Sequence, residues 1–150
     1  MVIEKLKESF KQVCDEIPKN QWRYFHKKSV ENFINYIENI KGNSERENTV
    51  ETLNNLLNDI TLNFEPNINY SLYLFNTYLK LVVPTFSNRL GFTSVPSKNV
   101  AIFLCLLLIS IFFVLRKHFY YEIGYCFILF FYFLSLYNKI KMNKVYGFGY

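Results

Sequence analysis

The side chains that could carry out chemistry are few and lie far apart in the sequence. They are His26, His118, Cys14, Cys105 and Cys126, with Asp15 next to Glu16 as the nearest thing to a carboxylate pair. No spacing typical of a metal site, a P-loop, a dinucleotide site or a hydrolase is present. The carboxylate pair precedes a proline and is typical of a helix end. The sequence therefore predicts no enzyme, no cofactor and no metal site, and His26, beside Lys27 and Lys28, is expected to be solvated.

Two apolar runs separated by a short charged turn occupy residues 100–137. The first run, residues 100–115, has no charge, and the second, residues 119–137, contains only Glu122. A helix of 16 residues is about 24 Å long, against roughly 30 Å of bilayer hydrocarbon, so each run is short for a spanning helix. However, the runs lack a polar face, and the rest of the chain has too little apolar surface to bury both. We therefore expect a two-helix transmembrane hairpin that either spans the membrane or dips into it.

Four residues near the turn form the candidate interface site of this hairpin. Arg116 and Lys117 lie at its tip, where long cationic side chains can reach the headgroups. Glu122 could pair with either cation across the turn, although an interfacial residue at a helix end is the simpler interpretation. Gly124 follows closely and would allow two helices to approach each other.

Charge is distributed unevenly along the chain. Residues 1–95 have eleven basic and eleven acidic residues, whereas residues 96–150 have six basic residues and one acid. Basic flanks of apolar runs favour the cytosolic side, so both termini are expected in the cytosol, although Arg116 and Lys117 weaken that preference. The cations do not gather with aromatic residues on one polar element, which argues against nucleic acid as a partner and leaves the lipid bilayer as the expected one.

The first part of the chain has helical periodicity. Apolar residues recur every three or four positions over residues 2–17, 21–41 and 50–60, which predicts short amphipathic helices in a cytosolic region, residues 1–62. A polar loop is expected before the third of them, with a capping box from Asn48 to Glu51.

A linker, residues 63–99, is expected to connect this region to the hairpin. Within it, residues 70–83 form an apolar stripe flanked by tyrosines and are followed by Pro84, which is expected to end the helix. This helix could lie on the membrane surface or be a fourth helix of the core, and the sequence favours neither. The expected fold is therefore all-α, with N-terminal amphipathic helices and a C-terminal membrane hairpin.

The last residues, 138–150, form a basic and aromatic tail that ends in KVYGFGY. Such a tail could rest at the lipid headgroups, or a partner protein could read it as a short motif. From the first apolar run through Glu122-Ile123-Gly124 to this tail, the order of segments resembles the SAYSvFN-domain family of small membrane proteins. Val145, Tyr146, Gly147 and Phe148 stand at the family's aromatic box, with Gly147 in place of its serine.

The resemblance implies a protein of the endoplasmic reticulum or vesicle membrane that acts as an adaptor in protein quality control, without catalysis. Its protein partner would bind the N-terminal helices or the tail, and a homo-oligomer is also compatible with the sequence. Two other functions fit the same pattern. A short hairpin with an interfacial helix could shape membranes, and a small membrane chain could be a subunit of a translocation or transport complex.

Overall fold

The computed structural model describes residues 2–94 and 119–147. In these stretches the protein is all-α except for two very short strands. The helices are α1 (Val2–Glu16), the 3₁₀-helix η1 (Lys19–Phe25), α2 (Lys27–Tyr36), the 3₁₀-turn η2 (Ile37–Asn39), α3 (Asn43–Asn63), α4 (Ile68–Leu74), the π-helix η3 (Phe75–Leu79), α5 (Lys80–Leu90) and α7 (Phe119–Lys141). The strands are β1 (Thr93–Ser94) and β2 (Val145–Tyr146).

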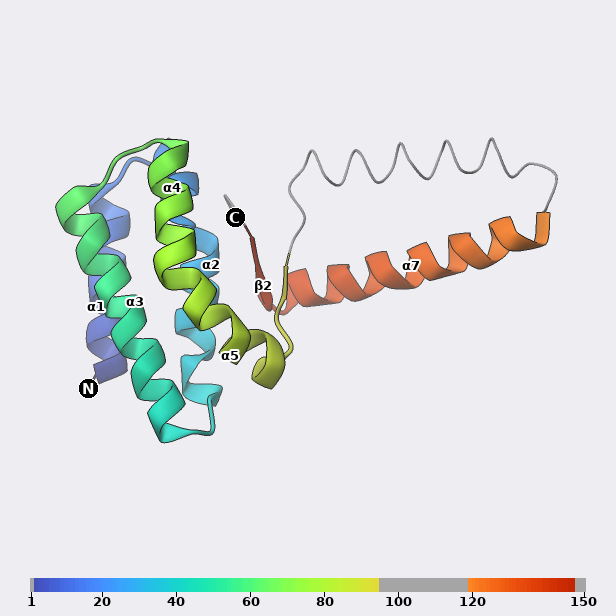
Figure 1. Cartoon of the computed structure of the whole chain (residues 1–150), viewed down its shortest axis with the longest axis horizontal. Helices are drawn as coiled ribbons and strands as arrows, with labels where there is room; N and C mark the ends of the chain where they lie inside the picture. Colours follow the sequence, from blue (N-terminus) through green and yellow to red (C-terminus); the bar gives the residue numbers. More distant parts are fainter. Residues whose placement is uncertain (1, 95–118, 148–150) are drawn as a thin grey trace.

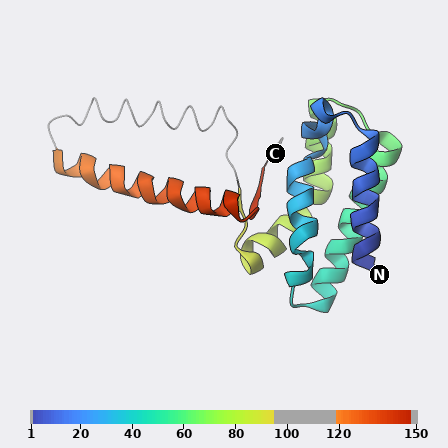
Figure 2. The same ribbon diagram turned by 180° about the vertical axis from the view of Figure 1, so that it is seen from behind.

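The helices from α1 to α5 pack into one body, and α7 leads away from it, as Figure 1 shows and Figure 2 confirms from behind. Each helix of the body contributes large apolar side chains to one continuous core. Fully buried members include Leu6, Phe25, Phe33, Ile37, Leu53, Leu57, Leu74, Leu79 and Phe86. The helical body therefore continues to Leu90, beyond the boundary at residue 62 that the sequence suggested.

The predicted helix over residues 2–17 is confirmed as α1, but the predicted helix over residues 21–41 is interrupted. The interruption lies at His26, which has a φ of 56° in the left-handed region. Its N–H donates to the carbonyl of Trp22 and closes η1. His26 is completely buried, so the prediction that it is solvated is wrong. The neighbouring lysines are a poor guide here because the turn directs the imidazole inward, away from them.

The third helix, α3, already begins at Asn43. The polar loop that was predicted just before this helix and the predicted capping box from Asn48 are therefore wrong. Gly42 occupies the N-cap position without a side-chain cap, and Glu45 lies in the first turn, where a negative charge is favourable to the helix dipole. Polar residues thus form exposed helical turns here. The apolar stripe that located the helix begins only at its second turn.

Residues 70–83 pack one face into the core of the helical body, in agreement with one of the two alternatives that the sequence left open. Tyr70, Leu74, Leu79 and Val82 are all buried in the body. Pro84 does not end the helix but lies inside α5. The backbone widens into the π-helix η3 just before α5, and Figure 1 shows the chain bending between α4 and α5. Proline and π-helical turns are the usual causes of such bends.

The C-terminal segment returns to the body. After α7, β2 pairs in parallel with β1, with Thr93 opposite Val145 and Ser94 opposite Tyr146. The N–H of Thr93 donates to the carbonyl of Lys144 at 3.0 Å. The chain leaves the body at β1 and comes back to the same place at β2.

Within the two described stretches, no helix combines the length and the apolarity that crossing a membrane requires.

Candidate functional site

The most elaborate polar site of the described residues is a stripe along one face of α2 and the turn before it. His26, Ser29, Asn32 and Tyr36 are spaced by three, three and four residues, so they lie on one side of the helix. His26, Ser29 and Asn32 are each almost completely buried. Buried polar side chains are normally hydrogen-bonded, so the question is what they bind.

The stripe binds the main chain of residues 142–147. Asn32 donates from Nδ2 to the carbonyl of Val145 at 2.8 Å. Ser29 Oγ donates to the carbonyl of Gly147 at 3.3 Å and lies 3.2 Å from the N–H of the same residue. Tyr36 donates from its hydroxyl to the carbonyl of Met142 at 2.5 Å. These partners are more than 100 residues apart in the sequence, and we call the surface formed by the stripe and β1 the tail groove.

His26 lies at the junction of three segments. Its Nε2 is 2.9 Å from the carbonyl of Ser71 in α4, and its Nδ1 is 3.4 Å from the carbonyl of Gly147. The Ser71 hydroxyl is also close to Nε2, at 3.1 Å, and the ring of Phe75 lies 5.6 Å away. Burial lowers the pKa of His26 below its ordinary value, although both carbonyl contacts act to raise it. The imidazole thus favours its neutral form in the closed site.

Aromatic rings form the floor of the tail groove. Phe33 stacks on Phe86 with centroids 4.5 Å apart and contacts Phe92 and Tyr146 at 5.5 and 6.0 Å. Val145 is completely buried, whereas Tyr146, whose ring contacts this floor, is partly exposed. The tail groove therefore buries the Val145 side chain, contacts the Tyr146 ring and forms hydrogen bonds with the backbone of the tail.

Two lysines that follow the second apolar run, Lys139 and Lys144, contact the helical body. Lys139 donates from Nζ to the carbonyl of Gly91 at 2.6 Å. Lys144 places its Nζ 5.4 Å from the centre of the Tyr36 ring, within range of a cation–π contact. Together with the β1–β2 pair, these contacts attach the end of α7 to the end of α5.

The residues singled out in the sequence lie in three different parts of the structure. Val145, Tyr146 and Gly147 come together in the tail groove, as described above. Glu122 and Gly124 lie in the first turns of α7, where only the backbone is described. Arg116, Lys117 and Phe148 lie outside the described residues, as does the first apolar run. Sequence reasoning missed His26, Ser29, Asn32 and Tyr36, although their helical spacing beside an apolar stripe was a detectable signal.

A second polar cluster joins α3 to α4 and η3. Tyr78 donates to Oδ2 of Asp59 at 2.9 Å, Asn63 donates to Oδ1 at 3.0 Å, and Tyr70 donates to the Asp59 carbonyl at 3.2 Å. Partial burial alone would raise the pKa of Asp59, but the hydrogen bonds from Asn63 and the tyrosines lower it overall. Burial raises the pKa of Tyr70 and of Tyr78. Both tyrosines therefore act as hydrogen-bond donors that fasten these helices.

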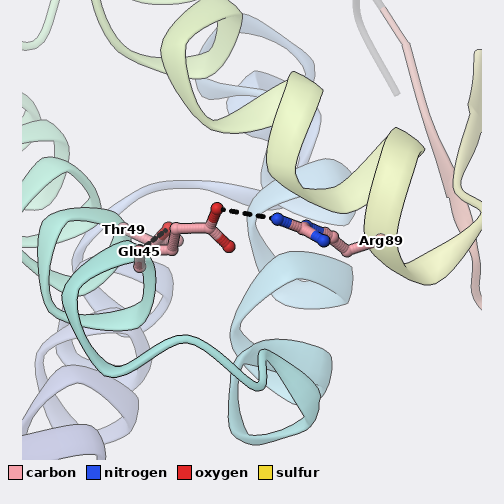
Figure 3. A network of polar contacts seen from close by, with 3 residues as sticks. All are labelled: Glu45, Thr49 and Arg89. Carbon is pink, nitrogen blue, oxygen red and sulfur yellow. Dashed lines mark hydrogen bonds and ion pairs between the residues drawn. The ribbon is translucent and has the colours of Figure 1, made fainter.

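The contacts in Figure 3 are also structural. Arg89 of α5 pairs with Glu45 of α3 at 3.2 Å, and Thr49 donates from Oγ1 to the Glu45 carbonyl at 2.7 Å. The Arg89 and Glu45 side chains are largely exposed, and such surface pairs contribute about 0–1 kcal/mol. This pair orients α5 on α3 without forming a reactive site.

Comparisons with known proteins add no relative. No family model, no curated protein and no solved structure matches the chain. The resemblance to the SAYSvFN-domain family stays a prediction.

Among residues 2–94 and 119–147, no group of three histidine, cysteine, aspartate or glutamate residues is placed to hold a metal ion.

Proposed function

We propose that this protein is an integral membrane adaptor, anchored through residues 100–137 as a helical hairpin, with the helical body in the cytosol. The observation that carries the proposal is the pairing of β1 with β2. Because Thr93 lies opposite Val145, the intervening segment starts and finishes at one point of the body. A membrane-inserted segment held in this way must have both flanks on the same side of the bilayer.

The exposed surface of α7 supports contact with lipid. Seven of its described apolar side chains are between 41% and 66% exposed, namely Ile128, Phe131, Tyr132, Phe133, Leu134, Tyr137 and Ile140. Four of them are consecutive, and successive residues of a helix point about 100° apart, so they face every direction. Large apolar surfaces of this kind mark contacts with a membrane or with another protein.

The cytosolic side and the endoplasmic reticulum are inferred from the sequence. Lys98, Lys139, Lys141 and Lys144 flank the proposed hairpin, against two cations in its turn, which favours cytosolic flanks. The short apolar runs suit the endoplasmic reticulum, whose bilayer is a few Å thinner than the plasma membrane. The adaptor role and the link to protein quality control rest on the resemblance to the SAYSvFN-domain family and on the interaction surface formed by the tail groove.

The membrane-shaping alternative drew on residues 70–83 as an amphipathic wedge on the membrane. That segment buries Leu74, Leu79 and Val82 in the body, whereas Leu72, Tyr73 and Leu81 are exposed, so membrane shaping stays a prediction from the sequence. Nothing in the described residues specifically favours a subunit of a translocation or transport complex, so that function stays a prediction from the sequence.

Glycosylation mapping in microsomes, combined with protease protection, tests the proposal. The acceptors are the native Asn69-Tyr70-Ser71 sequence and an engineered acceptor in a lengthened turn at residues 116–121. We expect modification of the turn alone and digestion of the helical body by added protease. Modification of Asn69 would contradict the cytosolic placement, and release of the chain by carbonate would contradict membrane anchoring. A carbonate-resistant chain modified at neither position would replace the spanning hairpin by a shallow one.

A further inference from the structure

We propose that the tail groove is a binding site for an extended segment of a partner protein, and that residues 144–147 occupy it as an internal competitor. The partner segment would carry an aliphatic residue, then an aromatic residue, then glycine. This inference deepens the adaptor role and rests on it, since it names the surface through which the adaptor would bind.

The first argument is that the groove recognises mostly backbone. Asn32 binds the carbonyl of Val145, Ser29 binds both the N–H and the carbonyl of Gly147, and Thr93 binds the carbonyl of Lys144. Every peptide has these groups, so the same hydrogen bonds are available to a segment from another chain. Adding an extended peptide to a strand edge is a common mode of peptide recognition.

The second argument is that the groove selects few side chains. Val145 is completely buried, Tyr146 lies against the ring of Phe33 at 6.0 Å, and Gly147 is buried beside Ser29. A charged residue in place of Val145 would be completely buried, at high cost. The order aliphatic, aromatic, glycine is therefore the one that the tail itself places in these three positions.

The third argument is that the occupant can be exchanged. The paired part of the tail is only two residues long on each strand, and Figure 1 shows β2 at the edge of the body, with the described chain ending just beyond it. A tethered segment competes at an effective concentration on the order of millimolar. A free segment of similar affinity would therefore bind weakly until the tail is displaced.

The test measures binding of a fluorescent peptide with the sequence of residues 143–150 to the full chain in detergent micelles. In the variant Val145→Asp, the chain's own tail should no longer bind in the tail groove. We expect this variant to bind the peptide at least tenfold more tightly than the wild type. A second change in the groove, Asn32→Ala, should weaken binding about tenfold, whereas Asn35→Ala on the exposed side of α2 should leave it unchanged.

A peptide with aspartate at its valine position and empty micelles serve as controls and should give no binding. Equal affinity of wild type and Val145→Asp, or equal binding of the aspartate peptide, would overturn the proposal. Far-UV circular dichroism verifies that each variant is folded. If Val145→Asp is not, the milder Val145→Thr takes its place and must also raise the affinity. These measurements do not depend on membrane sidedness, so failure here is distinguishable from a failed topology in microsomes.

Discussion

His26 is the residue that links the most distant parts of the described chain. Each of its ring nitrogens faces a carbonyl oxygen, that of Ser71 at 2.9 Å and that of Gly147 at 3.4 Å. Carbonyls only accept hydrogen bonds, and a neutral imidazole has a single N–H. The neutral ring therefore donates to one of these two carbonyls, and the Gly147 carbonyl also accepts from Ser29 Oγ.

The lowered pKa of His26 predicts loss of stability in mild acid. In the unfolded chain the imidazole takes up a proton near pH 6.5, whereas in the buried site it does so only at lower pH. The unfolded state therefore binds more protons in this window, and the free energy of unfolding falls as the pH drops below about 6.5, by at most about 1.4 kcal/mol per pH unit. Urea titrations in detergent between pH 7.5 and 5.5 measure the effect.

His26→Asn should remove this pH dependence, since asparagine tolerates the left-handed conformation and does not titrate. His118→Asn, which changes the other histidine, should keep it. Equal slopes for the two variants would show that His26 is not the responsible group.

At the scale of elements, the end of α5 is the point on which the tail attachment depends. Gly91 ends α5 with a φ of 69°, in the left-handed region, and its N–H and that of Phe92 both bond to the carbonyl of Phe86. The carbonyl of Gly91 receives Lys139, and the strand that pairs with the tail begins two residues later. The backbone conformation of Gly91 therefore determines three features: the end of α5, the contact with Lys139 of α7, and the start of the strand that pairs with the tail.

Gly91→Ala should destabilise the protein by about 1–2 kcal/mol, because alanine is strained in the left-handed region. A Cβ at this position would also lie 3.0 Å from Lys139 Nζ. Gly91→Asn introduces the same Cβ but tolerates the conformation, so it should lose less stability. Denaturant titration of both variants separates backbone strain from crowding. An equal loss in the two would mean that the lysine contact, and not the backbone, is responsible.

At the scale of the whole molecule, the body and α7 are joined where β1 meets β2. The pairing predicts a disulfide between cysteines placed at Ser94 and Tyr146, which are direct partners. Neighbouring strands lie about 4.8 Å apart, within the range that a disulfide spans. In a chain whose three native cysteines are replaced by alanine, mild oxidation in microsomes should give a fast-migrating monomer on a non-reducing gel.

The matched control pairs Ser94→Cys with Met142→Cys, which is exposed and lies before the strand. It should cross-link far less. If the cysteines at positions 94 and 146 form no disulfide, the pairing of β1 with β2 is contradicted. A cross-linked dimer would mean that the tail of one chain binds to a second copy.

Much of the fold follows from the sequence because apolar periodicity is a local property. The stripe in residues 2–17 is enough to locate α1, and the apolar positions from Val50 to Ile60 locate most of α3. The predictions failed at boundaries. His26 interrupts a helix although no proline or glycine stands there, and Pro84 lies inside the helix that follows a π-helical turn.

The sequence by itself determined that the N-terminal part is helical and that residues 100–137 are strongly apolar, since both depend only on which side chains follow one another. The tertiary structure decided that residues 70–83 belong to the core and that the tail returns to α2. Both decisions depend on contacts between distant residues. In the tail groove those contacts reach backbone carbonyls, which every residue has. The spacing of the polar residues on α2 was therefore detectable in the sequence, but the segment that they bind was not.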